Sequence, residues 1–329
     1  MKKVYIKKFA IYASENVMTA KSISEETGIP EDVVREKLGI VSKPVEEKLS
    51  LSDLSMKSIE KIVGPADSSL KRLKYIVSAG SDFKDKYIWT LAPSLAYKLG
   101  VKEALSFDIS SQCVGSLVAL DMMKSRISSE SNFDALISIA TKQSHIVNYK
   151  DRTGSFMYDF SDGSGAVLIS EEKGEYEILQ SAFLTDGSFS DVVYAPFGGS
   201  FILDKDIWSY KLTVSEEKAW KERMADATLR NFIRVITEAT VKSGYDIKDI
   251  DYLAFLHTKR SFHREIMDAL GIDRSKSIYL EDYGHMQGVD PFISLKLAEE
   301  KNLLRPGNLI CLVSAGTGWT WGATVILKV

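Results

Sequence analysis

The distribution of apolar positions along the chain predicts an α/β protein. Short runs rich in β-branched residues alternate with longer segments in which apolar residues recur at helical spacing. This alternation is typical of a mainly parallel sheet whose strands are connected by helices. The predicted strands lie at 75–79, 104–109 and 135–140 in the first half and at 252–256, 277–280 and 309–313 in the second, with a helix over 114–127.

The same order of elements occurs twice. Corresponding strands of the two halves are separated by roughly 175 residues, which favours two copies of one βα unit. The sequence at 165–169 also resembles the one at 322–326. We therefore expect two pseudo-equivalent halves, 1–172 and 173–329.

Two segments lie outside this repeat. Residues 185–220 are rich in aromatic and turn-forming residues, which suits either a packed surface excursion or the wall of a substrate channel. Residues 23–44 have the pattern of short amphipathic helices joined by turns.

Composition and charge exclude few classes of function. Of the 329 residues, 45% are hydrophobic and 26% are charged, and the net charge is −3. These are ordinary globular values that provide no general attraction to nucleic acid or to anionic membranes. No apolar run suggests a signal peptide or a membrane span. We expect a soluble, cytoplasmic protein that binds any anionic ligand through local basic residues.

Cys113 is the candidate nucleophile because it lies between a predicted strand and a predicted helix. Backbone N–H groups at the start of a helix carry partial positive charge and stabilise a thiolate, the attacking form of cysteine. A small buried core cysteine is the alternative interpretation of the same position. Cys311 lies within an apolar predicted strand, so we interpret it as a core residue.

Five motifs occur in the order found in ketoacyl-acyl-carrier-protein synthase III of the thiolase superfamily, and the resemblance extends over nearly the whole chain. The segment around Cys113 resembles the nucleophile segment of that family. Residues 149–153 and 162–167 resemble its Asp-Arg-Thr and Gly-Asp-Gly-Ala-Gly-Ala region. Residues 256–260 occupy the place of its His-Gln-Ala-Asn motif, and residues 283–285 resemble its Tyr-Gly-Asn motif. Residues 315–322 resemble its glycine-rich C-terminal signature. The family's early tryptophan and arginine are absent; Val33, Val34 and Lys43 occupy that region.

The resemblance implies a duplicated thiolase-like fold with layers in the order αβαβα. It also implies a cysteine, a histidine and an asparagine around one buried acyl site. Histidine replaces the asparagine here, so the implied catalytic set is Cys113 from the N-terminal half with His257 and His285 from the C-terminal half. Elongating ketoacyl synthases of the same superfamily use such a Cys-His-His set. A homodimer acting in fatty acid biosynthesis is implied as well.

The expected reaction is acyl transfer from a thioester to Cys113, followed by decarboxylative Claisen condensation with a malonyl thioester. Cys113 together with Thr317 and Gly318 of the glycine-rich turn would supply backbone donors for the tetrahedral oxyanion. Two neutral imidazoles, from His257 and His285, can each donate one N–H to the enolate oxygen, and either could move a proton near neutral pH. The expected substrate-binding residues are Arg152, Gly198, Gly199, Lys259 and Arg260.

Acyl-CoA and a malonyl thioester on coenzyme A or acyl carrier protein are the expected substrates, with no permanently bound cofactor and no metal. His145 and His263 lack the placement of the other two histidines, and we interpret them as surface or structural residues. A non-decarboxylating thiolase or hydroxymethylglutaryl-CoA synthase reaction is the alternative. Ser314 stands where thiolases carry a second cysteine, which weakens simple thiolase activity. A hydroxymethylglutaryl-CoA synthase needs a carboxylic acid near the nucleophile, and the end of the strand at 75–79 offers only the shorter Asp82. A non-catalytic protein that binds acyl thioesters remains a third possibility.

Overall fold

The computed structural model describes residues 2–64, 68–196, 211–215 and 220–329. The strands of its large sheet are β1 (Tyr5–Ala13), β4 (Leu73–Gly80), β5 (Leu105–Ser110), β6 (Asp134–Lys142), β7 (Asp162–Ser170), β8 (Tyr176–Thr185), β11 (Tyr252–Phe255), β12 (Leu309–Gly316) and β13 (Thr320–Lys328). The helices are α1 (Ala20–Thr27), α2 (Glu31–Val33), α3 (Leu51–Ile59), α4 (Leu91–Leu99), α5 (Gly115–Ser129), α6 (Trp220–Lys242), α7 (Arg260–Leu270) and α8 (Asp290–Glu300).

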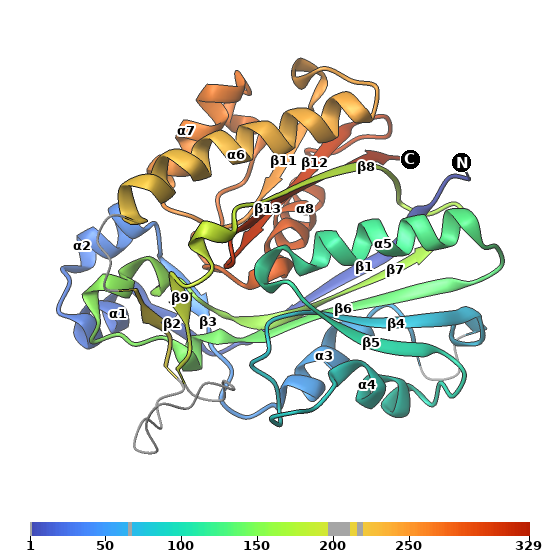
Figure 1. Cartoon of the computed structure of the whole chain (residues 1–329), viewed down its shortest axis with the longest axis horizontal. Helices are drawn as coiled ribbons and strands as arrows, with labels where there is room; N and C mark the ends of the chain where they lie inside the picture. The colour runs from blue at the N-terminus through green and yellow to red at the C-terminus, as the bar shows by residue number, and fades with distance from the viewer. Residues whose placement is uncertain (1, 65–67, 197–210, 216–219) are drawn as a thin grey trace.

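Helices and sheet are arranged in five layers (Figure 1). The strand order is β11-β12-β13-β8-β1-β7-β6-β4-β5, and the two halves meet where β1 pairs with β8. Helices α5 and α8 lie between the two halves of the sheet and pack against strands of both, while α3 and α4 cover one outer face and α6 and α7 cover the other. The αβαβα fold expected from the resemblance is confirmed.

The internal repeat is visible in the backbone as well as in the strand order. Within each half a parallel pair, β4 with β6 or β11 with β12, continues into an antiparallel strand, β7 or β13. The turn before each central helix also repeats, because Gln112 and Gln287 both have a left-handed backbone, with φ of 49° and 52°. These glutamines begin the turns η3 (Gln112–Val114) and η9 (Gln287–Val289), which contact one another.

The strand predicted at 277–280 is wrong. This segment follows the short turn η8 (Arg274–Lys276) and has no strand pairing. Side chains of other elements take the place of a strand partner: Ser277 donates its hydroxyl to the carbonyl of Leu253, and the N–H of Ile278 donates to the hydroxyl of Tyr252. Within the described ranges, the second half of the chain therefore contributes one strand fewer than the first to the large sheet, and β11 lies at its edge.

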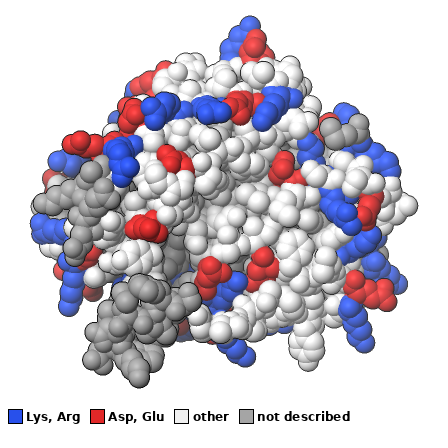
Figure 2. Space-filling view, in the orientation of Figure 1, with Lys and Arg blue, Asp and Glu red and all other residues white. Residues whose placement is uncertain are grey.

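The two segments outside the repeat lie near one another. The N-terminal segment contains α1, α2, the π-helical turn η1 (Val34–Leu38) and a small sheet of β2 (Val17–Thr19) and β3 (Ser42–Pro44). The later segment contains β9 (Val193–Tyr194), which pairs with β10 (Thr213–Val214), and its apolar side chains join the hydrophobic core around α6. On the face seen in Figure 2, positive and negative side chains alternate along the outer side of α6. No helix in the described part of the chain is long and apolar enough to span a membrane.

Candidate active site

Cys113 lies in the turn η3, between the end of β5 and the start of α5. The left-handed backbone of Gln112 turns the chain sharply from the strand into the helix, at a cost of about 1–2 kcal/mol for a residue with a Cβ. Cys113 is buried, with 7% of its surface exposed, and it is not part of a disulfide. Its sulfur therefore lies at the strand–helix junction that the sequence predicts.

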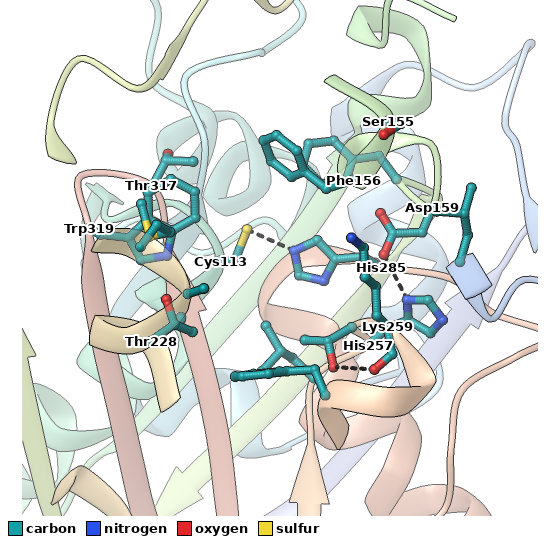
Figure 3. Close-up of a pocket in the computed structure, with 18 of the residues that line it drawn as sticks. Cys113, Ser155, Phe156, Asp159, Thr228, His257, Lys259, His285, Thr317 and Trp319 are labelled. Carbon is teal, nitrogen blue, oxygen red and sulfur yellow. Dashed lines mark hydrogen bonds and ion pairs between the residues drawn. The ribbon is translucent and has the colours of Figure 1, made fainter. Parts of the chain in front are cut away.

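His285 is in direct contact with Cys113. Its Nε2 lies 3.1 Å from the sulfur of Cys113 (Figure 3). Its Nδ1 lies 2.6 Å from Oδ2 of Asp290. Burial lowers the pKa of His285, but the opposing charges of the Cys113 thiolate and of Asp290 outweigh it and raise the pKa well above its usual value. Cysteine, imidazole and carboxylate thus form a chain that can hold a thiolate–imidazolium pair.

His257 lies beside this chain at the end of β11 and is also buried. Its Nδ1 lies 2.7 Å from Oδ2 of Asp159, and its Nε2 lies 3.3 Å from the carbonyl oxygen of Gly39. Both histidines therefore have a carboxylate at Nδ1. A neutral imidazole in which Nδ1–H donates to a carboxylate keeps a lone pair on Nε2, so its Nε2 donates only when the ring is protonated.

The backbone around His285 is fixed by contacts with the segment before β7. The N–H of His285 donates to the carbonyl of Asp159 at 2.8 Å, and the N–H of Ser161 donates to the carbonyl of His285. Gly284 has a left-handed φ of 62°, and a Cβ there would lie 2.3 Å from the carbonyl oxygen of Asp159. Only glycine allows this close approach without displacing the chain.

The buried Lys43 also holds the segment before β7 through hydrogen bonds. Its ammonium nitrogen donates to the hydroxyl of Tyr149 and to the carbonyl of Phe160, each at 2.6 Å. Burial lowers the pKa of Lys43 to about 8, although the nearby carboxylates of Asp159 and Asp162 favour its charged form. Lys43 therefore holds the backbone next to both histidines.

Cys113, His257 and His285 all line one cavity of about 460 Å³. Most of its wall is apolar, and it includes Leu38, Ile40, Phe156, Phe160, Trp220, Met224, Phe232, Leu256, Phe262, Ala315 and Trp319. Cys113 lies between Trp319 and Thr317 on one side and His285 on the other, and Asp159 and Ser155 lie beyond the histidine (Figure 3). A cavity of this size and polarity suits an apolar acyl chain and its thioester arm.

The glycine-rich turn lies against the backbone of the nucleophile segment. A Cβ on Gly316 would lie 3.0 Å from the backbone nitrogen of Cys113 and 2.8 Å from the carbonyl oxygen of Ser111. Thr317, the next residue, lines the cavity, and Gly318 follows it in the turn before β13. Two of the predicted oxyanion residues, Cys113 and Thr317, thus line the same cavity.

The predicted substrate-binding residues are placed differently from one another. Lys259 is exposed and lines the cavity, whereas Arg260 pairs with Glu281 and stacks over the ring of Tyr279. Arg152 is exposed, and its guanidinium lies 3.5 Å from the carbonyl oxygen of Gly28. The predictions for Gly198 and Gly199 lie outside the described residues.

The remaining histidines and Cys311 lie away from the cavity wall. His145 contacts the carbonyl oxygen of Glu46 at 2.7 Å, and His263 contacts the hydroxyl of Ser277 at 2.9 Å. Burial lowers the pKa of His263 to about 4, and it raises the pKa of Cys311 within β12. Among the described residues, no three His, Cys, Asp or Glu side chains are grouped as metal ligands.

Two residues of the site could not be found from the sequence alone. Asp290 follows His285 by five positions and precedes Pro291, a pattern that indicates a helix start rather than a carboxylate on an imidazole. Asp159 is 98 positions from His257, and no local signal links them. Asp159 and Asp290 are recognised as partners of the histidines only in the structure, because folding brings separate loops together.

The fold and the arrangement of cysteine, histidines and glycine-rich turn define an acyl-transferring enzyme of the thiolase superfamily. The family model "3-Oxoacyl-[acyl-carrier-protein (ACP)] synthase III" matches residues 107–187, and the corresponding C-terminal model matches residues 241–328. Together they cover more than half of the chain. The chain therefore belongs to the 3-oxoacyl-[acyl-carrier-protein] synthase III family and is a condensing acyltransferase.

Individual relatives agree over almost the full length. The β-ketoacyl-[acyl-carrier-protein] synthase III of Clostridium novyi is 26% identical over 329 residues, covering 99% of each chain. The enzyme of the same name from Oleidesulfovibrio alaskensis is 25% identical and covers 98% of each chain. The crystal structure of 3-oxoacyl-[acyl-carrier-protein] synthase III from Aquifex aeolicus superposes with a TM-score of 0.85 at 22% identity over 100% of both chains, which shows the shared fold.

Proposed function

We propose that this protein makes 3-oxoacyl thioesters by transferring an acyl group to Cys113 and condensing it with a malonyl thioester. The observation that carries the proposal is the 3.1 Å contact between the Cys113 sulfur and His285 Nε2, in a cavity that also contains His257. The curated relatives named above carry the name of this activity.

In the first half-reaction, the thiolate of Cys113 attacks the carbonyl carbon of an acyl-CoA, and the thiolate of coenzyme A leaves. The intermediate carries its negative charge on the former carbonyl oxygen. The backbone N–H of Cys113 and one N–H of the turn with Thr317 and Gly318 are the proposed donors to that oxygen, because Gly316 packs against Cys113 N. His285, as an imidazolium, stabilises the attacking thiolate.

In the second half-reaction, the malonyl carboxylate leaves as carbon dioxide and its bonding electrons form an enolate. Imidazolium N–H groups of His257 and His285 are the proposed donors to the enolate oxygen. The enolate carbon then attacks the acyl carbonyl, and the sulfur of Cys113 leaves again as a thiolate. The atoms balance without any net proton transfer to the histidines.

The thioester substrates are proposed to enter past Lys259. Coenzyme A and acyl carrier protein both present a phosphopantetheine arm, and Lys259 is an exposed cation at the cavity. Arg152, and the segment with Gly198 and Gly199, stay proposed contacts of the carrier. Because Arg260 is already paired with Glu281, we assign it a smaller part in binding.

A homodimer is proposed as the working form. Strand β5 is an edge strand that pairs with β4, and among the described residues the other side of its backbone has no strand partner. Leu105 at its start is 60% exposed, and Tyr87 and Ile88 in the preceding loop are 69% and 90% exposed. A second copy could pair with this edge and cover these apolar side chains.

Non-decarboxylating condensation is the second candidate. Once Cys113 is acylated, its thiolate charge no longer raises the pKa of His285, and an imidazole supported by Asp290 that has lost its proton can remove a proton from carbon. Two other observations weaken the specific forms of this alternative. Asp82 is exposed and bonded to Ser110. Ser314 is fully buried and donates to the carbonyl of Cys113.

The test is to supply acetyl-CoA and malonyl-CoA separately and together, and to follow both carbon dioxide release and the intact protein mass. We expect an acetyl adduct on wild-type protein with acetyl-CoA, none on Cys113→Ala, and stoichiometric carbon dioxide and 3-oxoacyl product with both substrates. Condensation without carbon dioxide would establish the non-decarboxylating alternative. Absence of any acyl adduct would leave a protein that only binds acyl thioesters.

A further inference from the structure

Asp159 is a buried carboxylate in the wall of the cavity. It lies between the turn η5 (Arg152–Met157) and the start of β7, and only 8% of its surface is exposed. Its Oδ2 lies 2.7 Å from His257 Nδ1, and Figure 3 shows this contact on the side of His285 that faces away from Cys113. Asp159 is therefore close to the reacting groups without touching the nucleophile.

Asp159 and Asp290 form a reciprocal arrangement with the two histidines. Asp290 accepts from His285 Nδ1 through its side chain and from the backbone N–H of His257. Asp159 contacts His257 Nδ1 through its side chain, and its backbone carbonyl accepts from the N–H of His285. Each aspartate thus fixes the ring of one histidine and the backbone of the other.

The neighbouring Asp162 has the hydrogen bonds expected of a carboxylate that only stabilises the fold. Asp162, three positions later, accepts from the N–H groups of Glu46 and Ser144 and from the hydroxyl of Ser144. Oδ1 of Asp159, in contrast, is buried without a hydrogen-bond partner in the described part of the chain. An unsatisfied buried polar group costs roughly 1–3 kcal/mol, so a role in stabilising the fold does not account for Asp159.

Among the described groups around the ring of His257, Asp159 supplies the carboxylate that contacts a ring nitrogen. The carbonyl oxygen of Gly39 faces Nε2, and the ring of Tyr279 lies 5.1 Å away, centre to centre. His263 lies behind Tyr279, and burial keeps its pKa low. Of the adjacent cations, Arg260 is paired with Glu281, whereas Lys259 is exposed. Both nitrogens of His257 therefore face oxygen atoms, and a ring that donates to both carries two protons.

We propose that Asp159 is a positioning residue that holds His257 as a doubly protonated imidazolium, whose Nε2–H faces the carbonyl of Gly39 in this structure and is shared with the thioester oxygen of the second substrate when that substrate binds. The inference rests on the proposed function, because it gives His257 a part in the condensation step only, whereas His285 acts in both steps and supports the Cys113 thiolate during acylation. A charged donor forms a stronger hydrogen bond to a developing enolate than a neutral one does. The carboxylate of Asp159 also fixes the orientation of the ring before substrate binds.

The test compares the two half-reactions in Asp159→Asn and Asp290→Asn. Acylation of Cys113 is measured by rapid mixing with acetyl-CoA and intact mass, and condensation by adding malonyl-CoA to the preformed acyl-enzyme. We expect Asp159→Asn to slow condensation roughly 10–100-fold more than acylation, and Asp290→Asn to slow acylation more strongly. Asp162→Asn is the matched control: it should lower thermal stability without separating the two steps.

Histidine-selective ¹⁵N labelling gives a readout that does not depend on turnover, since the chain has four histidines. The ring of His257, assigned with His257→Gln, should show two protonated nitrogens in wild-type protein and lose one in Asp159→Asn. Asp159→Glu should restore part of the wild-type signal and rate. An unchanged His257 spectrum in Asp159→Asn, or equal slowing of both half-reactions, would overturn the proposal. If wild-type protein acylates but never condenses, the proposed function fails, while the spectra still decide the role of Asp159.

Discussion

His285 Nε2 lies 3.1 Å from the sulfur of Cys113, although the two residues are 172 positions apart. One comes from the turn before α5 and the other from the segment before α8, the two helices that lie between the halves of the sheet. The contact joins the N-terminal half to the C-terminal half at the cavity. Four predictions follow from this site and from the fold that builds it.

The acylation rate should stay high at alkaline pH and fall only when His285 loses its proton. The raised pKa means that the imidazolium form, which pairs with the Cys113 thiolate, is present below that pKa and is lost as pH rises through it. Because Asp290 contributes to the raised value, Asp290→Asn should move the alkaline limb to lower pH. Rapid-mixing acylation rates of the wild-type protein and Asp290→Asn from pH 6 to 10 measure this shift. If both proteins lose activity at the same alkaline pH, the prediction is wrong.

Lys43→Met should alter the pH dependence of stability. Because the pKa of Lys43 is about 8 in the folded protein and near 10.5 when unfolded, the unfolded chain binds more protons between these values. Wild-type protein should therefore gain about 3 kcal/mol of unfolding free energy relative to Lys43→Met as pH rises from 7 to 10.5. Urea unfolding at several pH values tests this, with the exposed Lys248→Met as the control that should show no such gain.

Gly284→Ala should disrupt the site more than backbone strain alone explains. The added Cβ would meet the carbonyl oxygen of Asp159 at 2.3 Å, so the link from Asp159 to His285 must break. Gly244→Ala is a matched control, because that glycine also has a left-handed φ, of 87°, but no atom within 4 Å of the added Cβ. Both variants should lose roughly 1–3 kcal/mol of stability from strain, and only Gly284→Ala should also lose acyl transfer. Equal activity in both variants would show that the backbone link is dispensable.

Leu105→Asp should dissociate the proposed dimer. A charge on the exposed edge strand β5 would have to be buried against the partner, which costs free energy. Leu303→Asp, at another exposed leucine, is the control. Sedimentation over a range of concentrations should give a monomer for Leu105→Asp and a dimer for Leu303→Asp. A wild-type protein that is itself a monomer at every concentration would rule out this interface.

Local patterns in the sequence predicted most of the strands and the position of the candidate nucleophile. The runs at 75–79 and 135–140 form β4 and β6, which are buried strands and therefore need continuous apolar sequence. The run at 104–109 forms β5, a partly exposed strand at the edge of the sheet. Cys113 follows β5 directly, so its place at the strand–helix junction could be read from adjacent residues. The order of the motifs indicated the family and selected His257 and His285 as the candidate histidines.

Only the tertiary structure decided which polar groups support those histidines. Asp159 reaches His257, and Asp290 reaches both histidines, through loops that meet when the two halves pack together. The same cause explains the failure at 277–280, where Tyr252 and Ser277 satisfy the backbone in place of a neighbouring strand. Strand and helix patterns depend on neighbours along the chain, whereas hydrogen-bond partners depend on which loops folding brings within about 3 Å.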